Sequence, residues 1–312
     1  MSKNSLNKKL PAGREGLGQQ IANSYSTDPK AFRWGRLYSI ELRPTDWTGR
    51  YGGTMKKVSI PFDIKTLPVS LQPYIQTAAV YDSSSSEQAK TLYIEGANQP
   101  MFLKITKRDE LKREGLMSDY LHGKGLAPEV LAYEQHGDND YLLTFALQGD
   151  DGVSGGHLED PKRLAAVFGD SLRYLHSISA ADCPFPNRTA ELIQEYRESF
   201  MNKTGDTKGF PGGREQALLS LEKLQGTEDH DVLLHGDYCL PNLIMRNFQL
   251  EGFIDLGYGG IGDLHYDLYW GIWTLRYNLG SDDYQDIFLD HYGRNDFDPE
   301  RLALWTALTD SI

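Results

Sequence analysis

The chain has 312 residues, of which 39% are hydrophobic, so it is long enough to bury a sizeable core and to form about two domains or lobes. Its 44 acidic and 32 basic residues give a formal net charge of -12, the opposite of the balance typical of a nucleic-acid-binding protein, so we expect no nucleic-acid partner. No apolar run of about 18 residues occurs, which predicts no membrane span, and the N-terminus lacks the apolar stretch of a secretory signal. The two scattered cysteines, Cys183 and Cys239, form neither a disulfide framework nor paired zinc spacing, so we expect a cytoplasmic protein.

The first 54 residues differ from the rest in charge. Residues 1–54 contain nine basic and four acidic residues, a net of +5, so the remainder carries -17. This segment is rich in Gly, Ser and Asn and has no clear periodicity, and we interpret it as a flexible or loosely attached extension. A small ordered cap around "AFRWGRLYSIEL" is the alternative.

Residues 55–148 are predicted to be rich in strands. "TAAVYD" and "KTLYIEG" read as two strands joined by the turn "SSSSEQA", and "QPMFLKIT" reads as a third. A helix follows in "RDELKREGLMSDYLHGKG", with Asp109 as its N-cap, Leu111, Met117 and Leu121 buried, and Gly123 or Gly125 at its end. "EVLAYEQHGDNDYLLTFAL" then supplies two more strands around a polar turn.

Residues 149–312 are predicted to be mostly helical. The first helix starts near Pro161 and buries Leu164, Val167, Phe168, Leu172 and Leu175. Further helices are expected in "RTAELIQEYRESFM", "REQALLSLEKLQG", "DLYWGIWTLRYNLG", "SDDYQDIFLDHYG" and "PERLALWTALTDSI". The fold class is therefore α+β: a β-rich lobe, a short linker between Thr144 and Gly149, and a helical lobe. Ligands often bind at such a junction.

The stretch "LLHGDYCLPNLI" places Asp237 and Asn242 on one loop, and "EGFIDLG" follows after a polar turn. The two segments read as a β-hairpin. If the turn is centred between Phe248 and Gln249, Asn242 pairs with Asp255 at the open end, and Asp237 lies just before it. Two carboxylates and an amide oxygen would then converge, which suits Mg²⁺ with one carboxylate left to act as a base.

Phosphoryl transfer needs this arrangement, because a metal neutralises the phosphate while a separate carboxylate holds the attacking hydroxyl. We therefore predict Asp237 as the catalytic base and Asn242 and Asp255 as the Mg²⁺ ligands. Each of these motifs alone is weak evidence for a catalytic site, since an Asp and an Asn at this spacing also occur in ordinary loops with Asx-turns. Together with Lys104 in an upstream strand, the combination is much more specific.

With these residues in view, "HGDYCLPN", "GFIDLGYGGIGDLHYDL" and "FLKI" resemble the aminoglycoside phosphotransferases, in particular their 3'-phosphotransferase branch. The resemblance covers about residues 60–312. It implies a bilobal protein-kinase-like fold and an enzyme that phosphorylates an aminoglycoside hydroxyl with ATP or GTP. The partners implied are thus a nucleotide and a cationic small molecule.

The resemblance also assigns the nucleotide contacts. Lys104 matches the lysine that binds the α- and β-phosphates, and Glu114 matches its helix partner. Thr144 and Ala146 fall in the interlobe linker that would meet the adenine, and His235 matches the histidine that braces the catalytic loop. The nucleotide loop between the first two strands is replaced by Ser83, Ser84, Ser85 and Ser86, which could donate to phosphate or form a solvated turn.

The acceptor side departs from the family. Tyr258 stands where relatives often have Arg after "IDLG", and Tyr277 and Asn278 stand where an acidic pair often follows the arginine matched by Arg276. The acceptor contacts are expected from Glu195, Glu198, Arg276, Asp310 and the α-carboxylate of Ile312. The set of acidic contacts for a polycationic substrate is thinner than in the family.

Three functions are open at this point. The leading one is an aminoglycoside 3'-phosphotransferase-like kinase. The second is a kinase of the same superfamily that acts on another alcohol, such as an amino sugar. The third is a non-catalytic nucleotide-binding protein, which the complete set of Lys104, Asp237, Asn242 and Asp255 argues against. The sequence leaves the oligomeric state open.

Overall fold

The computed structural model describes residues 58–311 except 87, 97–98, 155, 208, 211 and 227–229. The predicted extension, residues 1–54, and the predicted acceptor contact Ile312 lie outside the described residues. All described residues belong to one compact unit of the chain.

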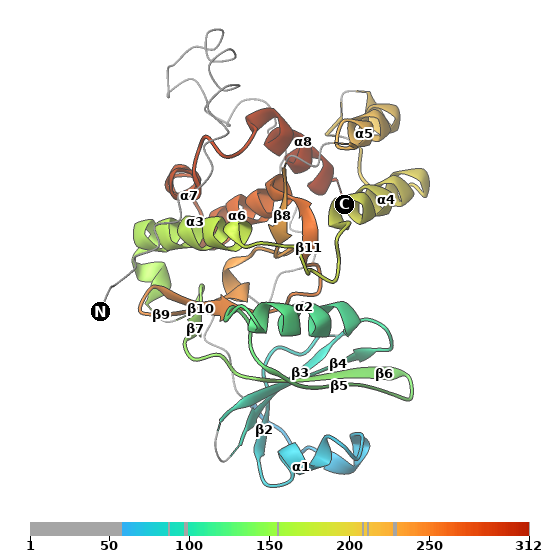
Figure 1. The fold of residues 1–312 in the computed structure, drawn as a ribbon, viewed down its shortest axis with the longest axis vertical. Coiled ribbons are helices and arrows are strands. Elements are labelled where there is room, and N and C mark those ends of the chain that lie inside the picture. The colour runs from blue at the N-terminus through green and yellow to red at the C-terminus, as the bar shows by residue number, and fades with distance from the viewer. Residues whose placement is uncertain are drawn as a thin grey trace, which may run out of the picture. The chain divides into compact units, whose positions relative to one another are not determined.

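The β-rich lobe is built on a six-stranded antiparallel sheet, drawn in the lower part of Figure 1. Its order is β1–β2–β3–β4–β6–β5, so β4 pairs with both β3 and β6. Apolar residues of this sheet pack with the short segments η2 and α1 into one core cluster. The bounds are β1 Val58–Ser59, η2 Ile64–Thr66, α1 Gln72–Ile75, β2 Ala79–Asp82, β3 Lys90–Glu95, β4 Met101–Lys107, β5 Val130–His136 and β6 Asn139–Phe145.

Helix α2, Lys112–His122, lies between this sheet and the rest of the chain in Figure 1. Leu111, Met117 and Leu121 are buried and Gly123 is the C-cap, as predicted. The prediction of Asp109 as the N-cap of this helix was wrong, because the N-cap residue is Leu111. The backbone N–H of Leu111, at the start of α2, instead donates to Oδ2 of the buried Asp140 at 3.0 Å. A carboxylate from strand β6 thus anchors the start of the helix, and local sequence cannot show such a contact because it depends on tertiary packing.

The helical lobe begins after a linker at 146–149. Two small sheets lie here, with the strand orders β10–β9–β7 and β11–β8. The predicted catalytic loop connects β8 of one sheet to β9 of the other. The helices match the predicted segments, and most of their apolar residues pack into two neighbouring clusters. The bounds are β7 Asp150–Asp151, η3 His157–Glu159, α3 Pro161–Ser177, α4 Arg188–Met201, α5 Gly213–Glu222, β8 Asp231–Leu234, η5 Leu240–Asn242, β9 Leu243–Arg246, β10 Gln249–Phe253, β11 Gly260–Asp263, α6 Leu264–Leu279, α7 Gln285–Tyr292 and α8 Pro299–Thr309. Among the described residues, no helix is both long and apolar enough to cross a bilayer.

The predicted β9–β10 hairpin forms, but its register differs by one residue from the prediction. Gln249 pairs with Arg246, so the turn is centred between Asn247 and Phe248, whose φ values of 54° and 62° are those of a two-residue type I′ turn. After a β-bulge, Ile254 rather than Asp255 lies opposite Asn242, and its N–H donates to the Asn242 carbonyl at 3.0 Å. Asp255 follows in a left-handed conformation, with φ 57°.

Candidate active site

A partly exposed ion-pair cluster joins the two lobes. The Lys104 ammonium, on β4, lies 2.6 Å from Oε2 of Glu114 on α2 and 2.9 Å from Oδ1 of Asp255 beyond β10. The side chains of Lys104 and Glu114 are 23% and 11% exposed, and that of Asp255 is 49% exposed. Three of the predicted residues, from three separate elements, therefore converge.

The charges of this cluster shift one another's pKa. Burial disfavours the ammonium of Lys104, but the Asp255 and Glu114 carboxylates outweigh it and raise its pKa. The Lys104 charge lowers the pKa of Asp255. Burial raises the pKa of Glu114 despite the lysine. Two carboxylates thus hold the Lys104 ammonium in place, and an ammonium can bind a phosphate group through charge-assisted hydrogen bonds.

The loop between β8 and η5 holds Asp237. Its Oδ2 accepts a hydrogen bond from Nδ2 of Asn242 at 2.9 Å, and its Oδ1 accepts one from the Cys239 thiol at 3.3 Å. The backbone N–H of Asp237 donates to Nδ1 of His235, which is buried. Burial raises the pKa of Asp237, and the nearby Asp255 carboxylate adds to this, which suits a group that has to take up a proton.

The backbone of this loop is held by a residue that sequence reasoning did not assign. Asp267, in the first turn of α6, is completely buried, and its carboxylate accepts the N–H groups of His235 at 2.7 Å and Gly236 at 2.8 Å. Nε2 of His176 lies 3.2 Å from the same carboxylate. The available signal was an Asp inside an aromatic, otherwise apolar helix, because such a charge is buried only when it has partners.

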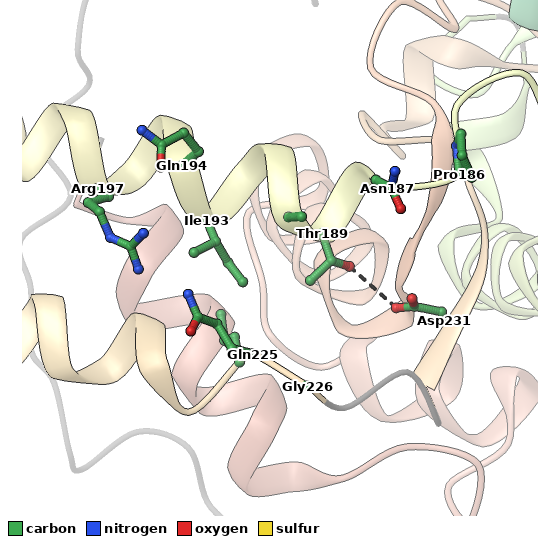
Figure 2. A pocket seen from close by; sticks show the side chains of 11 residues that line it. Pro186, Asn187, Thr189, Ile193, Gln194, Arg197, Gln225, Gly226 and Asp231 are labelled. Atoms are coloured by element: carbon green, nitrogen blue, oxygen red, sulfur yellow. Dashed lines mark hydrogen bonds between the residues drawn. The ribbon is translucent and has the colours of Figure 1, made fainter.

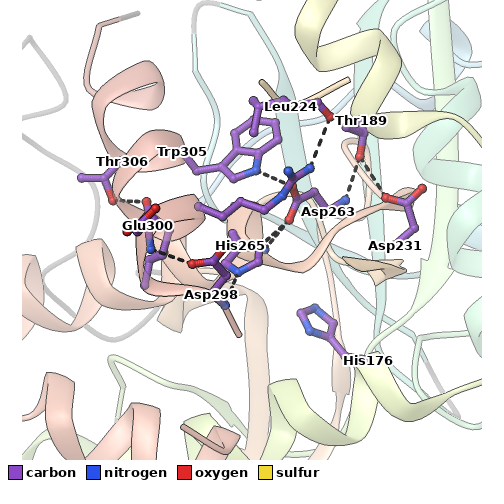
Figure 3. Close-up of polar contacts among 12 residues, drawn as sticks. His176, Thr189, Leu224, Asp231, Asp263, His265, Asp298, Glu300, Trp305 and Thr306 are labelled. Atoms are coloured by element: carbon purple, nitrogen blue, oxygen red, sulfur yellow. Dashed lines mark hydrogen bonds and ion pairs between the residues drawn. The ribbon is translucent and has the colours of Figure 1, made fainter. Parts of the chain in front are cut away.

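A second buried carboxylate, Asp263, ties the end of β11 to α6 and α8 (Figure 3). It accepts hydrogen bonds from Trp305 at 2.7 Å and from Arg301, and lies 2.6 Å from Nδ1 of His265. The N–H of Asp298 donates to Nε2 of His265, so we assign the ring proton to Nδ1.

The pKa values of Asp263 and His265 are both lowered. Burial opposes the charge of Asp263, but the hydrogen bond and charge of His265, with Trp305 and Arg301, outweigh it and lower the pKa to about 2. Burial lowers the pKa of His265 in spite of Asp263. At neutral pH Asp263 is therefore ionised and His265 neutral.

The predicted nucleotide contacts are partly engaged within the protein. The Ser85 hydroxyl accepts the N–H of Thr91, and the Ser86 hydroxyl accepts the N–H of Ala89, so these two serines stabilise the β2–β3 turn. Ser83 Oγ is buried, with no hydrogen-bond partner among the described residues. In the linker, the Ala146 N–H donates to the Pro100 carbonyl at 2.8 Å, while Thr144 is paired within the sheet.

Of the predicted acceptor contacts on α4, Glu195 is held by a cation. Oε1 of Glu195 lies 2.7 Å from Arg188, which also contacts Glu191 and donates to the carbonyl of Tyr258. Glu191 in turn pairs with Arg113 of α2 at 2.6 Å. Two arginines thus neutralise these two carboxylates. Glu198 is exposed and accepts a hydrogen bond from Gln194.

The described end of the chain is docked. Oδ1 of Asp310 accepts the Tyr269 hydroxyl at 2.6 Å, and the carbonyl of the buried Ser311 accepts the N–H of Asp206 at 2.7 Å. Burial raises the pKa of Asp310. Arg276 is exposed and lies 3.4 Å from Asp282. No hydrogen bond or ion pair joins Asp310 to Asp237 among the residues that the structure describes.

A pocket of about 340 Å³ lies between α4 and the chain that leads from α5 into β8 (Figure 2). Two of its lining residues, Thr189 and Asp231, are joined by a hydrogen bond from the threonine hydroxyl. None of the described lining residues is a predicted site residue, although Gln194 donates to Glu198. The predicted catalytic and metal-binding residues meet instead at the interlobe junction.

The chain was compared with known protein families and with curated proteins. A model of the "Phosphotransferase enzyme family" matches residues 83–305. A probable aminoglycoside 3'-phosphotransferase from Lactococcus lactis subsp. lactis is 37% identical over 246 residues, which cover 78% of this chain and 94% of that protein. An aminoglycoside 3'-phosphotransferase from Niallia circulans is 34% identical over 221 residues, covering 67% and 82%.

Solved structures show the same fold. An aminoglycoside 3'-phosphotransferase of type VIII aligns with a TM-score of 0.60 at 23% identity, over 73% of this chain and 90% of that one. An aminoglycoside phosphotransferase from Streptomyces rimosus, in complex with ADP and streptomycin, aligns with a TM-score of 0.57 at 22% identity, over 70% and 89%. The predicted bilobal kinase-like fold is thereby confirmed. The chain belongs to the phosphotransferase enzyme family, and its relatives place it among the aminoglycoside 3'-phosphotransferases.

Proposed function

We propose that this phosphotransferase moves the γ-phosphate of ATP or GTP to a hydroxyl of an aminoglycoside antibiotic and so confers resistance. The observation that carries the proposal is the Asp237 carboxylate, held on both oxygens, in the same junction as the Lys104–Glu114–Asp255 cluster. A relative named as a probable aminoglycoside 3'-phosphotransferase is 37% identical over 94% of its length.

The reaction follows from the positions of these side chains. Lys104, kept in place by Glu114, would bind the α- and β-phosphates of the nucleotide. The acceptor hydroxyl would donate its hydrogen bond to Asp237. As the acceptor oxygen bonds to the γ-phosphorus, the bond from that phosphorus to the bridging oxygen breaks, ADP keeps the electron pair, and Asp237 takes the hydroxyl proton.

Asn242 and Asp255 would hold the Mg²⁺ that accompanies the nucleotide. Carboxylate and amide oxygens are the donors that Mg²⁺ prefers, so the residues present fit the ion. The amide nitrogen of Asn242 faces Asp237, which turns the amide oxygen away from that carboxylate. The ion, when bound, neutralises charge on the phosphates.

The direct test replaces Asp237 with Asn. We expect kcat to fall by about 10²–10⁴-fold, the usual contribution of a general base, with KM for the nucleotide nearly unchanged. Asp170→Asn is the matched control, because Asp170 is an exposed carboxylate on α3 that pairs with His291. Turnover is measured as release of ADP from ATP and of GDP from GTP over a panel of aminoglycosides. Near-normal kcat in a well-folded Asp237→Asn variant would overturn the assignment.

An amino sugar or another less charged alcohol is the second candidate acceptor. The observation that favours it is the Arg188 contact of Glu195, which removes one of the anionic groups expected to attract a polycation. Adding amino sugars and simple alcohols to the same panel separates the two candidates. A higher kcat/KM for an amino sugar than for every aminoglycoside would favour the second.

A further inference from the structure

Cys239 lies beside the catalytic base. Its thiol donates to Oδ1 of Asp237 at 3.3 Å, while Nδ2 of Asn242 donates to Oδ2 at 2.9 Å. Each carboxylate oxygen therefore has one donor. Because an ionised carboxylate has about four acceptor positions, both oxygens keep room for a further hydrogen bond.

Helix α6 anchors the backbone beside the thiol. Thr274 is 1% exposed, and its hydroxyl accepts the N–H of Leu240, the residue after Cys239, at 3.2 Å. The same hydroxyl accepts a hydrogen bond from Nδ2 of Asn278 at 3.1 Å. Both acceptor positions of the Thr274 hydroxyl are thereby used, which fixes it beside the catalytic loop.

The groups form a connected support: the Asn278 amide donates to the Thr274 hydroxyl, this hydroxyl holds the Leu240 N–H, and the neighbouring Cys239 thiol donates to Asp237. Asn278 is also anchored on the Thr274 carbonyl at 2.8 Å. Relatives often carry an acid at this position, whereas here the Asn278 side chain forms hydrogen bonds with Thr274 inside the protein.

We propose that Asn278, Thr274 and Cys239 are positioning residues that fix the Asp237 carboxylate for the acceptor hydroxyl. The inference rests on the role of Asp237 in the proposed function. A carboxylate held on one oxygen can rotate about its Cβ–Cγ bond, whereas one held on both presents a fixed lone pair. Small misplacements of a reacting group are costly in rate, so the loss is expected in kcat.

The test removes and restores the hydrogen-bonding group at two positions. Cys239→Ala and Thr274→Val should each lower kcat by about two- to twelvefold, the range that matches a net hydrogen bond of about 0.5–1.5 kcal/mol. KM for nucleotide and for aminoglycoside should change by less than about twofold, since neither side chain is placed in a binding contact. Cys239→Ser and Thr274→Ser keep a hydrogen-bonding group and should recover most of the lost kcat.

Coupling distinguishes one connected support of Asp237 from two independent packing effects. The double variant Cys239→Ala, Thr274→Val should be no slower than the slower single variant, whereas independent effects would multiply. Cys183→Ala is the control for loss of a cysteine, because Cys183 lies in the helical-lobe core near the Met117 sulfur, and its kcat should match the parent protein.

Two outcomes overturn the proposal: unchanged kcat in Cys239→Ala, or loss of kcat that serine does not restore. If the parent protein phosphorylates no aminoglycoside, the proposed substrate fails instead. The same variants are then compared on ATP hydrolysis, where Asp237 would hold the attacking water, and equal rates in all of them would overturn the positioning role.

Discussion

Replacing Asp267 with Asn should loosen the catalytic loop without changing the size of the side chain. The carboxylate accepts backbone N–H groups at 2.7 and 2.8 Å and is completely buried. Asparagine has one acceptor oxygen, so its NH₂ group would face one of the two N–H donors and leave that donor unpaired. A hydrogen bond to a charged group contributes about 1.5–3 kcal/mol, so the loss of one with an unpaired donor should cost about 2–4 kcal/mol.

Urea titration and thermal melting test this value. For a chain of this size each kcal/mol lowers Tm by about 2–4 °C, so the expected decrease is about 4–16 °C. The control is Asp298→Asn, because Asp298 caps α8 by accepting the Glu300 N–H, and Asn caps helices about as well as Asp. If Asp267→Asn unfolds at the same urea concentration as this control, the carboxylate does not hold the loop as argued.

Other predictions concern the metal, pH, the extension and the acceptor. Asp255→Asn should weaken ATP binding only when Mg²⁺ is present; equal weakening without Mg²⁺ in a calorimetric titration would exclude the metal role. Because burial lowers the pKa of His265, the unfolded chain takes up that proton first, so the free energy of unfolding should fall as the pH drops below about 6.5. Because the pKa of Asp263 is lowered from 3.8 to about 2, the free energy of unfolding should fall further between these two pH values. A stability profile from urea titrations that is flat between pH 7 and pH 4 would refute the His265 prediction, and one that is flat between pH 4 and pH 2 would refute the Asp263 prediction. Removal of residues 1–54 should leave a folded, active enzyme, and an insoluble product would show that the boundary is wrong. Asp310→Asn should raise KM for an aminoglycoside by up to about tenfold and leave KM for ATP unchanged, and equal changes in both would remove Asp310 from the acceptor site.

The secondary structure was predictable where the periodicity was strong and the ends were marked by Gly or Pro. The helix that starts at Pro161 and the strand that carries Lys104 are examples. The hairpin register was missed by one residue because two residues with left-handed φ, Asn247 and Phe248, make a tight turn that favours Gly or Asn, and Phe248 gave no such signal.

The site was predictable as far as its residues share a local motif or a recognised family pattern. Asp237 and Asn242 lie on one short loop, and their contact follows from that proximity. The supports were not predictable, because Asp140 and Asp267 act on segments about 30 residues away in the chain. Their partners are fixed by packing, which single-sequence patterns do not encode.

The most direct test of the account incubates the full-length protein with ATP, Mg²⁺ and an aminoglycoside panel, and measures ADP release together with the mass of the antibiotic. The account predicts ADP release in proportion to a product heavier by one phosphoryl group, at a hydroxyl position, with turnover largely abolished in Asp237→Asn. ADP release with no phosphorylated aminoglycoside, or phosphorylation that persists at the full rate in Asp237→Asn, would contradict it.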